Sequence, residues 1–169
     1  MRPSKLAYGE YYANYIGLVK EDDVHNALAN SVTPSTEFWN SLTEEQGNYR
    51  YAEGKWSIKE LLQHIIDTER IFSYRALAFA RGETTTLPGY DENEYADASL
   101  ADERKLSDLV QELSVVRQST LHLFNSFSSE NLDKIGEASN APLSARAAGF
   151  IIVGHEIHHM NVLSEKYLV

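Results

Sequence analysis

Apolar side chains recur at three- and four-residue intervals along most of the chain, which is the spacing of an amphipathic helix. No segment alternates apolar and polar residues as a half-buried strand would. Four long segments have the helical pattern, and proline, glycine or polar clusters separate them. We therefore predict an all-α protein in which four long helices pack into a four-helix bundle.

The first of these helices should begin after Asp22 and Asp23. Its apolar positions are Val24, Leu28, Val32, Phe38 and Leu42. Pro34 interrupts the pattern, and a proline inside a helix removes one hydrogen bond and clashes with the preceding turn. We therefore expect either a kink at Pro34 or two shorter helices.

The second helix has the clearest start signal in the chain. Ser57 and Glu60 form an S-x-x-E capping box, in which each side chain satisfies the backbone N–H of the other residue. The apolar pattern continues to about Arg81, and Gly82 suits the position just past a helix end. We predict a helix from Ile58 to about Arg81.

A long loop is predicted over residues 82–98, because this segment contains the turn signal Pro88-Gly89 and several poor helix formers. Loops of this length in compact domains are often functional. We expect this loop to shape a pocket.

The last two helices follow this loop. The third should begin near Ser99, and its apolar stripe continues to Phe127. A linker comes next. Ser144 can cap the fourth helix, which should run towards Tyr167.

An aromatic arm is predicted over residues 1–20, ahead of the bundle. Its tyrosines recur at helical spacing, at Tyr8, Tyr11, Tyr12 and Tyr15. Such a stripe either packs on the body of the protein or lines the mouth of a pocket, and the sequence leaves both interpretations open. The length of 169 residues is that of one domain, so we expect a single domain over residues 1–169.

Composition and charge narrow the classes of function. Apolar residues make up 43% of the chain, yet there is no run of about 18 apolar residues that could span a membrane. The N-terminus lacks the apolar core of a signal peptide, and the absence of cysteine excludes disulfides, thiolate ligands and a cysteine nucleophile. The net charge of -10, without a basic run, argues against nucleic-acid binding. We expect a cytoplasmic protein.

Two histidines in the fourth helix are the first candidates for chemistry. His155 and His159 are four residues apart, so their side chains project from one helix face. They lie within the apolar stripe, between Ile152 and Val162, which predicts that both point into the bundle. Burying two imidazoles one turn apart is costly unless both are paired, and one metal ion would satisfy both.

A third histidine can complete the site. His64 shares a face of the second helix with Leu61, Thr68 and Ile71, so it should also point inward. A lone buried histidine is usually bonded to a carbonyl or a carboxylate, and that interpretation stays open for each of the three. Three inward histidines in one bundle favour a metal site, because bundle cores regularly hold such sites.

Three neutral imidazoles would leave the full charge on a divalent ion. Such an ion polarises a carbonyl or lowers the pKa of bound water, and it could equally stabilise a thiolate from a cosubstrate. Imidazole suits Zn, Ni, Cu and Fe. The residues alone do not choose among these ions; our expectation for the protein is Zn or Ni.

Residues 155–159 match H-E-x-x-H, the signature of zinc proteases. Those enzymes take a third ligand from further along the chain, and only ten residues follow His159 here. The zinc protease interpretation is therefore disfavoured. Glu156 lies on the flank of the ligand face, where it could orient a ligand or act as a base. Alternatively it is a solvated or salt-bridged residue.

Other polar residues near the three histidines have weaker signals. Asp67, one turn after His64, could orient a ligand N–H or pair with a nearby arginine. Arg75 is about three turns, or roughly 16 Å, from His64 along the helix axis, and we expect it to pair with an acidic residue. His158 is interpreted as a partly exposed structural residue. His25 and His122 are expected on the surface.

Two blocks of sequence resemble the DinB superfamily, and its DinB/YfiT-like metalloenzyme branch in particular. They are GKWSIKELLQHIIDTER at residues 54–70 and GHEIHHMNVL at residues 154–163. The segments YRAL at 74–77 and LPGYD at 87–91 are also similar to that family. The resemblance covers nearly the whole chain, and the two histidine blocks are its specific part.

The resemblance implies a four-helix bundle of up-down-down-up type, usually dimeric, with a divalent ion on three histidines. The matching positions in this chain are His64, His155 and His159. It also implies a metal-dependent hydrolase, or a thiol S-transferase that uses a low-molecular-weight thiol with a small-molecule substrate. We expect a homodimer with no nucleic-acid or membrane partner. The alternative is a non-catalytic helical bundle with a structural or vestigial metal site.

Overall fold

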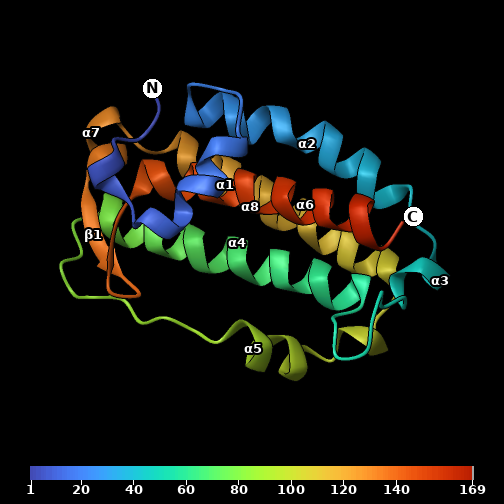
Figure 1. Ribbon diagram of the computed structural model, residues 1–169. Coiled ribbons are helices and arrows are strands. Elements are labelled where there is room, and N and C mark those ends of the chain that lie inside the picture. Colours follow the sequence, from blue (N-terminus) through green and yellow to red (C-terminus); the bar gives the residue numbers. More distant parts are fainter. Residues whose placement is uncertain (169) are drawn as a thin grey trace.

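Four long helices form the body of the computed structural model, which describes residues 1–168 (Figure 1). They are α2 (Val24–Asn40), α4 (Ile58–Ala80), α6 (Leu106–Asn125) and α8 (Ala145–Lys166). Helices α2 and α4 each pack against both α6 and α8. The colours of Figure 1 show that α2 and α8 run one way while α4 and α6 run the other way. The up-down-down-up four-helix bundle is therefore confirmed.

The start and end of α4 agree with the sequence signals. Ser57 Oγ accepts a hydrogen bond from the Glu60 backbone N–H at 3.0 Å, and the Glu60 carboxylate accepts one from the Ser57 N–H at 2.7 Å. The helix ends at Ala80, and Gly82 has a φ of 92°, which is the left-handed conformation typical of a helix C-terminus. The local sequence alone therefore sets both ends of the helix that holds His64.

Helix α2 is unbroken from Val24 to Asn40, so the expectation of two shorter helices at Pro34 is wrong. A proline in a helix costs about 3 kcal/mol. The buried side chains on both sides of it, Leu28 and Trp39 among them, provide more than that by packing into the bundle. Tertiary packing therefore overrides the local signal at Pro34.

The segment between α4 and α6 returns the chain along the outside of α4, because these two helices run parallel (Figure 1). The predicted loop over residues 82–98 is only partly correct, since α5 (Glu92–Ser99) occupies its second half. Asp91 caps α5 by accepting bonds from two backbone N–H groups, and this cap was missed. Helix α6 begins at Leu106 rather than near Ser99, because Leu100, at a φ of 51°, ends α5.

A short β-hairpin precedes α8, which corrects the expectation that the chain has no strand. Strands β1 (Ile135–Ala138) and β2 (Ala141–Ser144) pair antiparallel around the turn residues Ser139 and Asn140. Both turn residues have positive φ, 54° and 60°, as a two-residue hairpin turn requires. The turn lacks the glycine that normally signals this geometry, so the pattern did not predict it.

The N-terminal arm packs along the bundle. It consists of two short 3-10 turns, Lys5–Ala7 and Glu10–Tyr12, followed by α1 (Ala13–Leu18), which packs against α8. Gly154 permits this approach, because a Cβ atom there would lie 1.9 Å from the carbonyl oxygen of Tyr15. The arm therefore sits directly over the helix that holds His155 and His159.

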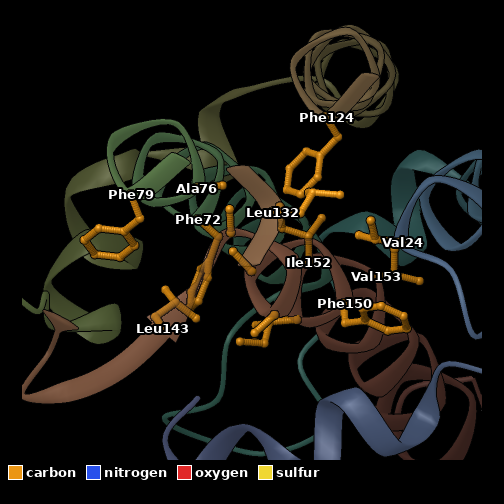
Figure 2. Close-up of a cluster of buried hydrophobic side chains, with 14 of the residues drawn as sticks. Val24, Phe72, Ala76, Phe79, Phe124, Leu132, Leu143, Phe150, Ile152 and Val153 are labelled. Carbon is orange, nitrogen blue, oxygen red and sulfur yellow. The ribbon is translucent and has the colours of Figure 1, made fainter. Parts of the chain in front are cut away.

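The core consists of two apolar clusters. Figure 2 shows part of the first, which contains Phe72 of α4, Phe124 of α6 and Ile152 of α8. The second lies nearer the other end of the helices, around Trp39, Leu62 and Leu109. The remaining short helices, α3 (Glu44–Gly47) and α7 (Ser129–Asp133), flank the bundle. Among residues 1–168, no helix is long and apolar enough to cross a bilayer.

Candidate metal centre

Three histidine rings meet between the antiparallel helices α4 and α8. The Nε2 atom of His155 lies 3.0 Å from Nε2 of His64 and 3.0 Å from Nε2 of His159. All three candidate ligand atoms fall within 4.8 Å of one another. The structure therefore brings together the three histidines that the sequence singled out.

Hydrogen bonding between the rings does not explain this arrangement. An imidazole Nε2 carries either one proton or one lone pair, so His155 Nε2 can form a good bond to only one neighbour. Two imidazole nitrogens bound to one ion at about 2.0–2.1 Å lie roughly 3 Å apart when the angle at the ion is near 90°. Both nitrogen contacts of His155 have that length. The donor set and its spacing therefore fit one divalent ion.

Burial keeps the three rings in the neutral state that a metal ligand needs. It lowers the pKa of His64 to about 4 and that of His159 to about 3. His155 is 6% exposed, and burial together with the other imidazoles lowers its pKa well below the usual value. At neutral pH no proton therefore has to be displaced before an ion can bind.

Glu156 faces away from the three rings. Its carboxylate accepts hydrogen bonds from Ser35 Oγ, from Trp39 Nε1 at 3.1 Å and from Arg117 Nη2 at 2.8 Å. Arg117 also binds both carboxylate oxygens of Glu69 on α4. Glu156 thus belongs to a network that joins all four helices. This agrees with the salt-bridged interpretation of Glu156, and its contacts do not support a role as base or as an orienting acceptor.

Asp67 likewise binds groups other than the imidazoles. Its carboxylate accepts a hydrogen bond from Gln63 Nε2 at 2.9 Å and pairs with Arg70 at 3.5 Å. The pairing with a nearby arginine is therefore the alternative that the structure adopts. Nδ1 of His159 is buried and has no hydrogen-bond partner among residues 1–168. Packing, including the edge of the His158 ring, holds the His159 ring in place.

A cavity of about 230 Å³ opens in front of the three histidines. Aromatic side chains dominate its wall: Tyr11, Tyr12, Tyr15, Trp56, Phe72 and Tyr90. Three of these belong to the N-terminal arm, so the arm both packs on the body and lines the pocket. Tyr15 also sets its ring edge-on to His155, with centroids 5.4 Å apart. The segment after α4 contributes Tyr90, whose hydroxyl is bonded to Thr68 Oγ1 at 2.9 Å.

Arg75 lines the same cavity, and the expectation that it pairs with an acidic residue is wrong. Its guanidinium donates from Nη2 to the carbonyl of Pro88 at 2.9 Å and to Ser139 Oγ at 3.0 Å. No carboxylate of residues 1–168 lies within ion-pair distance of it. Arg75 therefore bonds to two neutral acceptors instead of a carboxylate. One comes from the segment after α4 and the other from the hairpin turn.

The other histidines lie outside the three-ring cluster. His158 is half-buried, with its ring edge-on to Tyr15. His122 is exposed, as predicted, whereas His25 is half-buried with an unbonded Nδ1 among the described residues. The segment 82–98, which was expected to shape a pocket, contributes Tyr90 to the cavity wall. Trp56 and Ser139 were not singled out from the sequence as cavity residues, because only the folded path of the chain brings them there.

The fold and the site define a class of protein: an up-down-down-up helical bundle with three histidines converging from two of its helices. Comparison with known proteins names that class. The model of the DinB superfamily matches residues 33–163, and the chain belongs to that superfamily. The resemblance of the two histidine blocks is thereby confirmed.

Two known proteins are similar to this chain over most of its length. One, from Oceanobacillus iheyensis, is named "Putative metal-dependent hydrolase OB0413" and is 26% identical over 146 residues, or 82% of each chain. The other is the solved structure of YfiT from Bacillus subtilis, described as "a probable metal-dependent hydrolase with an unusual four-helix bundle topology". It superposes with a TM-score of 0.69 over 98% of this chain and 90% of its own, at 16% identity. That likeness shows the shared fold.

Proposed function

We propose that this protein is a metal-dependent hydrolase of small molecules, with a divalent ion held by His64, His155 and His159. The observation that supports the proposal is the double contact of His155 Nε2, 3.0 Å from the Nε2 atoms of both other rings. The names of the two similar proteins support the same reaction class. Zn and Ni are the ions we favour, since both suit imidazole ligands.

The site suits catalysis better than a structural role. Structural zinc sites usually have four protein ligands, whereas catalytic sites keep at least one position open. Three imidazoles converge here, and they border a cavity rather than packed side chains. An ion in this place supplies Lewis acidity, which polarises a carbonyl group or activates water for attack.

The side chains around the ion provide binding and exclusion of water. Tyr12, Tyr15 and Phe72 make an apolar wall against which the body of a small substrate can pack. The hydroxyls of Tyr15 and Tyr90 lie among these rings and can donate hydrogen bonds to a polarised oxygen. Burial raises the pKa of the Tyr90 phenol, so it stays protonated at neutral pH, and its proton is free for a substrate when Thr68 Oγ1 is the donor in the bond between the two hydroxyls.

The first experiment measures metal content and hydrolysis together. Tag-free protein purified without chelator should contain about one Zn or Ni per chain and should hydrolyse members of a panel of small esters, amides and lactones. Chelation should abolish hydrolysis, and the same ion should restore it. The His159→Ala variant should lose both metal and activity while keeping its helical circular dichroism spectrum.

His122→Ala is the matched control, because His122 is an exposed histidine outside the cluster. It should keep the metal and the activity of the parent protein. Full hydrolysis by the metal-free protein, or by His159→Ala, would contradict the proposal. If the protein consumes a low-molecular-weight thiol together with an electrophile and leaves the esters, amides and lactones intact, its reaction is thiol transfer and not hydrolysis. A metal that cannot be removed without unfolding would favour the non-catalytic alternative.

A further inference from the structure

Arg75 is a buried cation without a counter-ion in the part of the chain that the structure describes. Its side chain is 2% exposed. Two other arginines are nearly as buried, and each has a carboxylate partner: Arg117 with Glu69 and Glu156, and Arg146 with Asp133. Burying an unpaired charge is costly, so an unpaired buried guanidinium inside a cavity indicates a site for an anion.

The cavity that holds the three histidines also holds the Arg75 guanidinium. Phe72, whose ring centroid is 5.0 Å from the guanidinium carbon, and Ser139, which accepts a bond from Nη2, both line that cavity. The positions 64, 68, 72 and 75 follow one another along a single face of α4, and all four line the cavity. The cavity therefore extends along this helix from His64 to Arg75.

The polar groups around Arg75 leave donors free for a ligand. Nη2 already donates to the carbonyl of Pro88 and to Ser139 Oγ, and the Tyr12 phenol lies within hydrogen-bonding reach of the guanidinium. A guanidinium has five N–H donors, so these three neighbours leave donors for a ligand. Ser139 accepts from Arg75, so its own hydroxyl proton can be donated to the same anion. Glu92 also borders the cavity, but its side chain is exposed and forms no ion pair with Arg75.

We propose that Arg75 and Ser139 form a subsite for a carboxylate on the substrate, at the opposite end of the cavity from the three histidines. This proposal rests on the proposed function, and it adds the substrate class: small, elongated carboxylic acids with the scissile group at the other end. The Cα atoms of residues 64 and 75 are roughly 16 Å apart along the helix axis. This distance sets an upper limit for the length of the substrate. The aromatic rings between them suit an apolar linking segment.

The test uses pairs of probes that differ only at the end near Arg75. Each pair has a hydroxamate head that chelates zinc, an alkyl chain of four to eight carbons and either a carboxylate or a neutral carboxamide at the other end. Binding to the zinc-loaded protein is measured by calorimetry. At the best chain length the carboxylate should bind about tenfold tighter or more, as a charged hydrogen bond in a buried site predicts.

Arg75→Gln should remove this preference while leaving the affinity of the carboxamide probe within about twofold. The matched control is Arg81→Gln, which removes the same charge at the exposed C-terminal end of the same helix and should keep the preference. Equal affinities of the two probes for the parent protein, or a preference that survives in Arg75→Gln, would overturn the proposal. The comparison of probes in the parent protein needs no variant to fold.

A second arm separates the failure of this subsite from a failure of the metal site. The metal-free protein is titrated with 5-phenylpentanoate and with 5-phenylpentanamide, neither of which needs an ion. Tighter binding of the carboxylate, lost in Arg75→Gln, would support the subsite even if zinc did not bind. Equal or absent binding of both compounds, with hydroxamates binding normally to the zinc form, would overturn the subsite and leave the metal centre intact.

Discussion

Two buried polar centres lie next to each other in the bundle, and consecutive residues of α8 belong to them. His155 faces α4 and the cavity, together with two other neutral rings. Glu156 faces α2 and α6, where serine, tryptophan and arginine donors bind both of its carboxylate oxygens. The Glu156 centre is closed, since its charges are paired within the protein. The His155 centre is open, since its three rings border a cavity, and the Arg75 guanidinium at the far end of that cavity has no carboxylate partner among residues 1–168.

This difference separates the residues that hold the fold from those that are free for chemistry. A satisfied buried network fixes how the helices pack, whereas unsatisfied groups beside a cavity are candidates for binding. The network of Glu69, Arg117 and Glu156 also lies between the two apolar clusters of the core, on the evidence of its positions along the helices. It therefore fixes the position of α4 relative to α8. The three histidines converge only when these two helices are placed in this way.

The largest effect is expected where the two centres differ most, at their arginines. Arg117→Gln leaves two carboxylates buried without their cation and should lower the free energy of unfolding by about 3–5 kcal/mol. Arg75→Gln breaks no ion pair and should lower it by about 1 kcal/mol or less. Urea denaturation of both metal-free variants measures this. If Arg117→Gln and Arg75→Gln lowered the free energy of unfolding equally, the distinction between a closed and an open centre would be wrong.

A smaller effect should appear in the pH dependence of the metal-free protein. The folded-state pKa of His64, about 4, lies below its unfolded value near 6.5, so the unfolded chain takes up the proton first. Stability is therefore lost as the pH falls from about 6.5 to 4, at close to 1.4 kcal/mol per pH unit for this residue. Between pH 7 and pH 5 this amounts to about 2 kcal/mol.

His64→Gln should remove that part of the slope, and His122→Ala should not. The measurement is urea denaturation of the metal-free proteins at several pH values. An unchanged slope in His64→Gln would mean that the ring is not buried as the structure shows. Below pH 4 the folded state also takes up the proton, so no further loss from His64 is expected.

Gly154 connects the open centre to the N-terminal arm. In Gly154→Ala the new Cβ would collide with the carbonyl oxygen of Tyr15, which should cost about 1–3 kcal/mol and displace the arm from the cavity. Metal affinity and the free energy of unfolding should both be measured. Gly17→Ala is the matched control: no atom lies within 4 Å of the added Cβ, so it should be neutral or slightly stabilising.

The smallest effect on the metal is expected from Glu156→Gln, despite its place in the H-E-x-x-H match. The change weakens the Arg117 network and should reduce stability, yet zinc stoichiometry should stay at about one per chain. Hydrolysis per bound zinc should also stay near that of the parent. A loss of turnover with zinc still bound would give Glu156 the role of a base that its contacts do not support.

Local signals predicted the parts of the molecule that depend on neighbours in sequence. The capping box at Ser57 and the cap at Ser144 set the starts of α4 and α8, and the i, i+4 spacing put His155 and His159 on one face. The three histidines could be chosen from the sequence because helical periodicity alone turned them inward. Ser139 could not, since only the folded hairpin brings it to Arg75.

The predictions that failed depend on partners distant in sequence. Pro34 stays inside an intact helix because the side chains on both sides of it pack into the bundle. The direction of Glu156 is set by Trp39 and Arg117, which lie 117 and 39 residues away from it. Arg75 was expected to find an acidic partner, as buried arginines usually do, and the absence of one among the described residues became visible only when the loops were in place.

The most direct test of the open centre is the crystal structure of the zinc-loaded protein, with anomalous diffraction at the zinc edge. We expect one zinc ion bound to the Nε2 atoms of His64, His155 and His159, with one or more water molecules on its cavity side. An ion fully enclosed by four protein ligands, or an anomalous peak elsewhere in the molecule, would contradict the account of an open three-histidine centre.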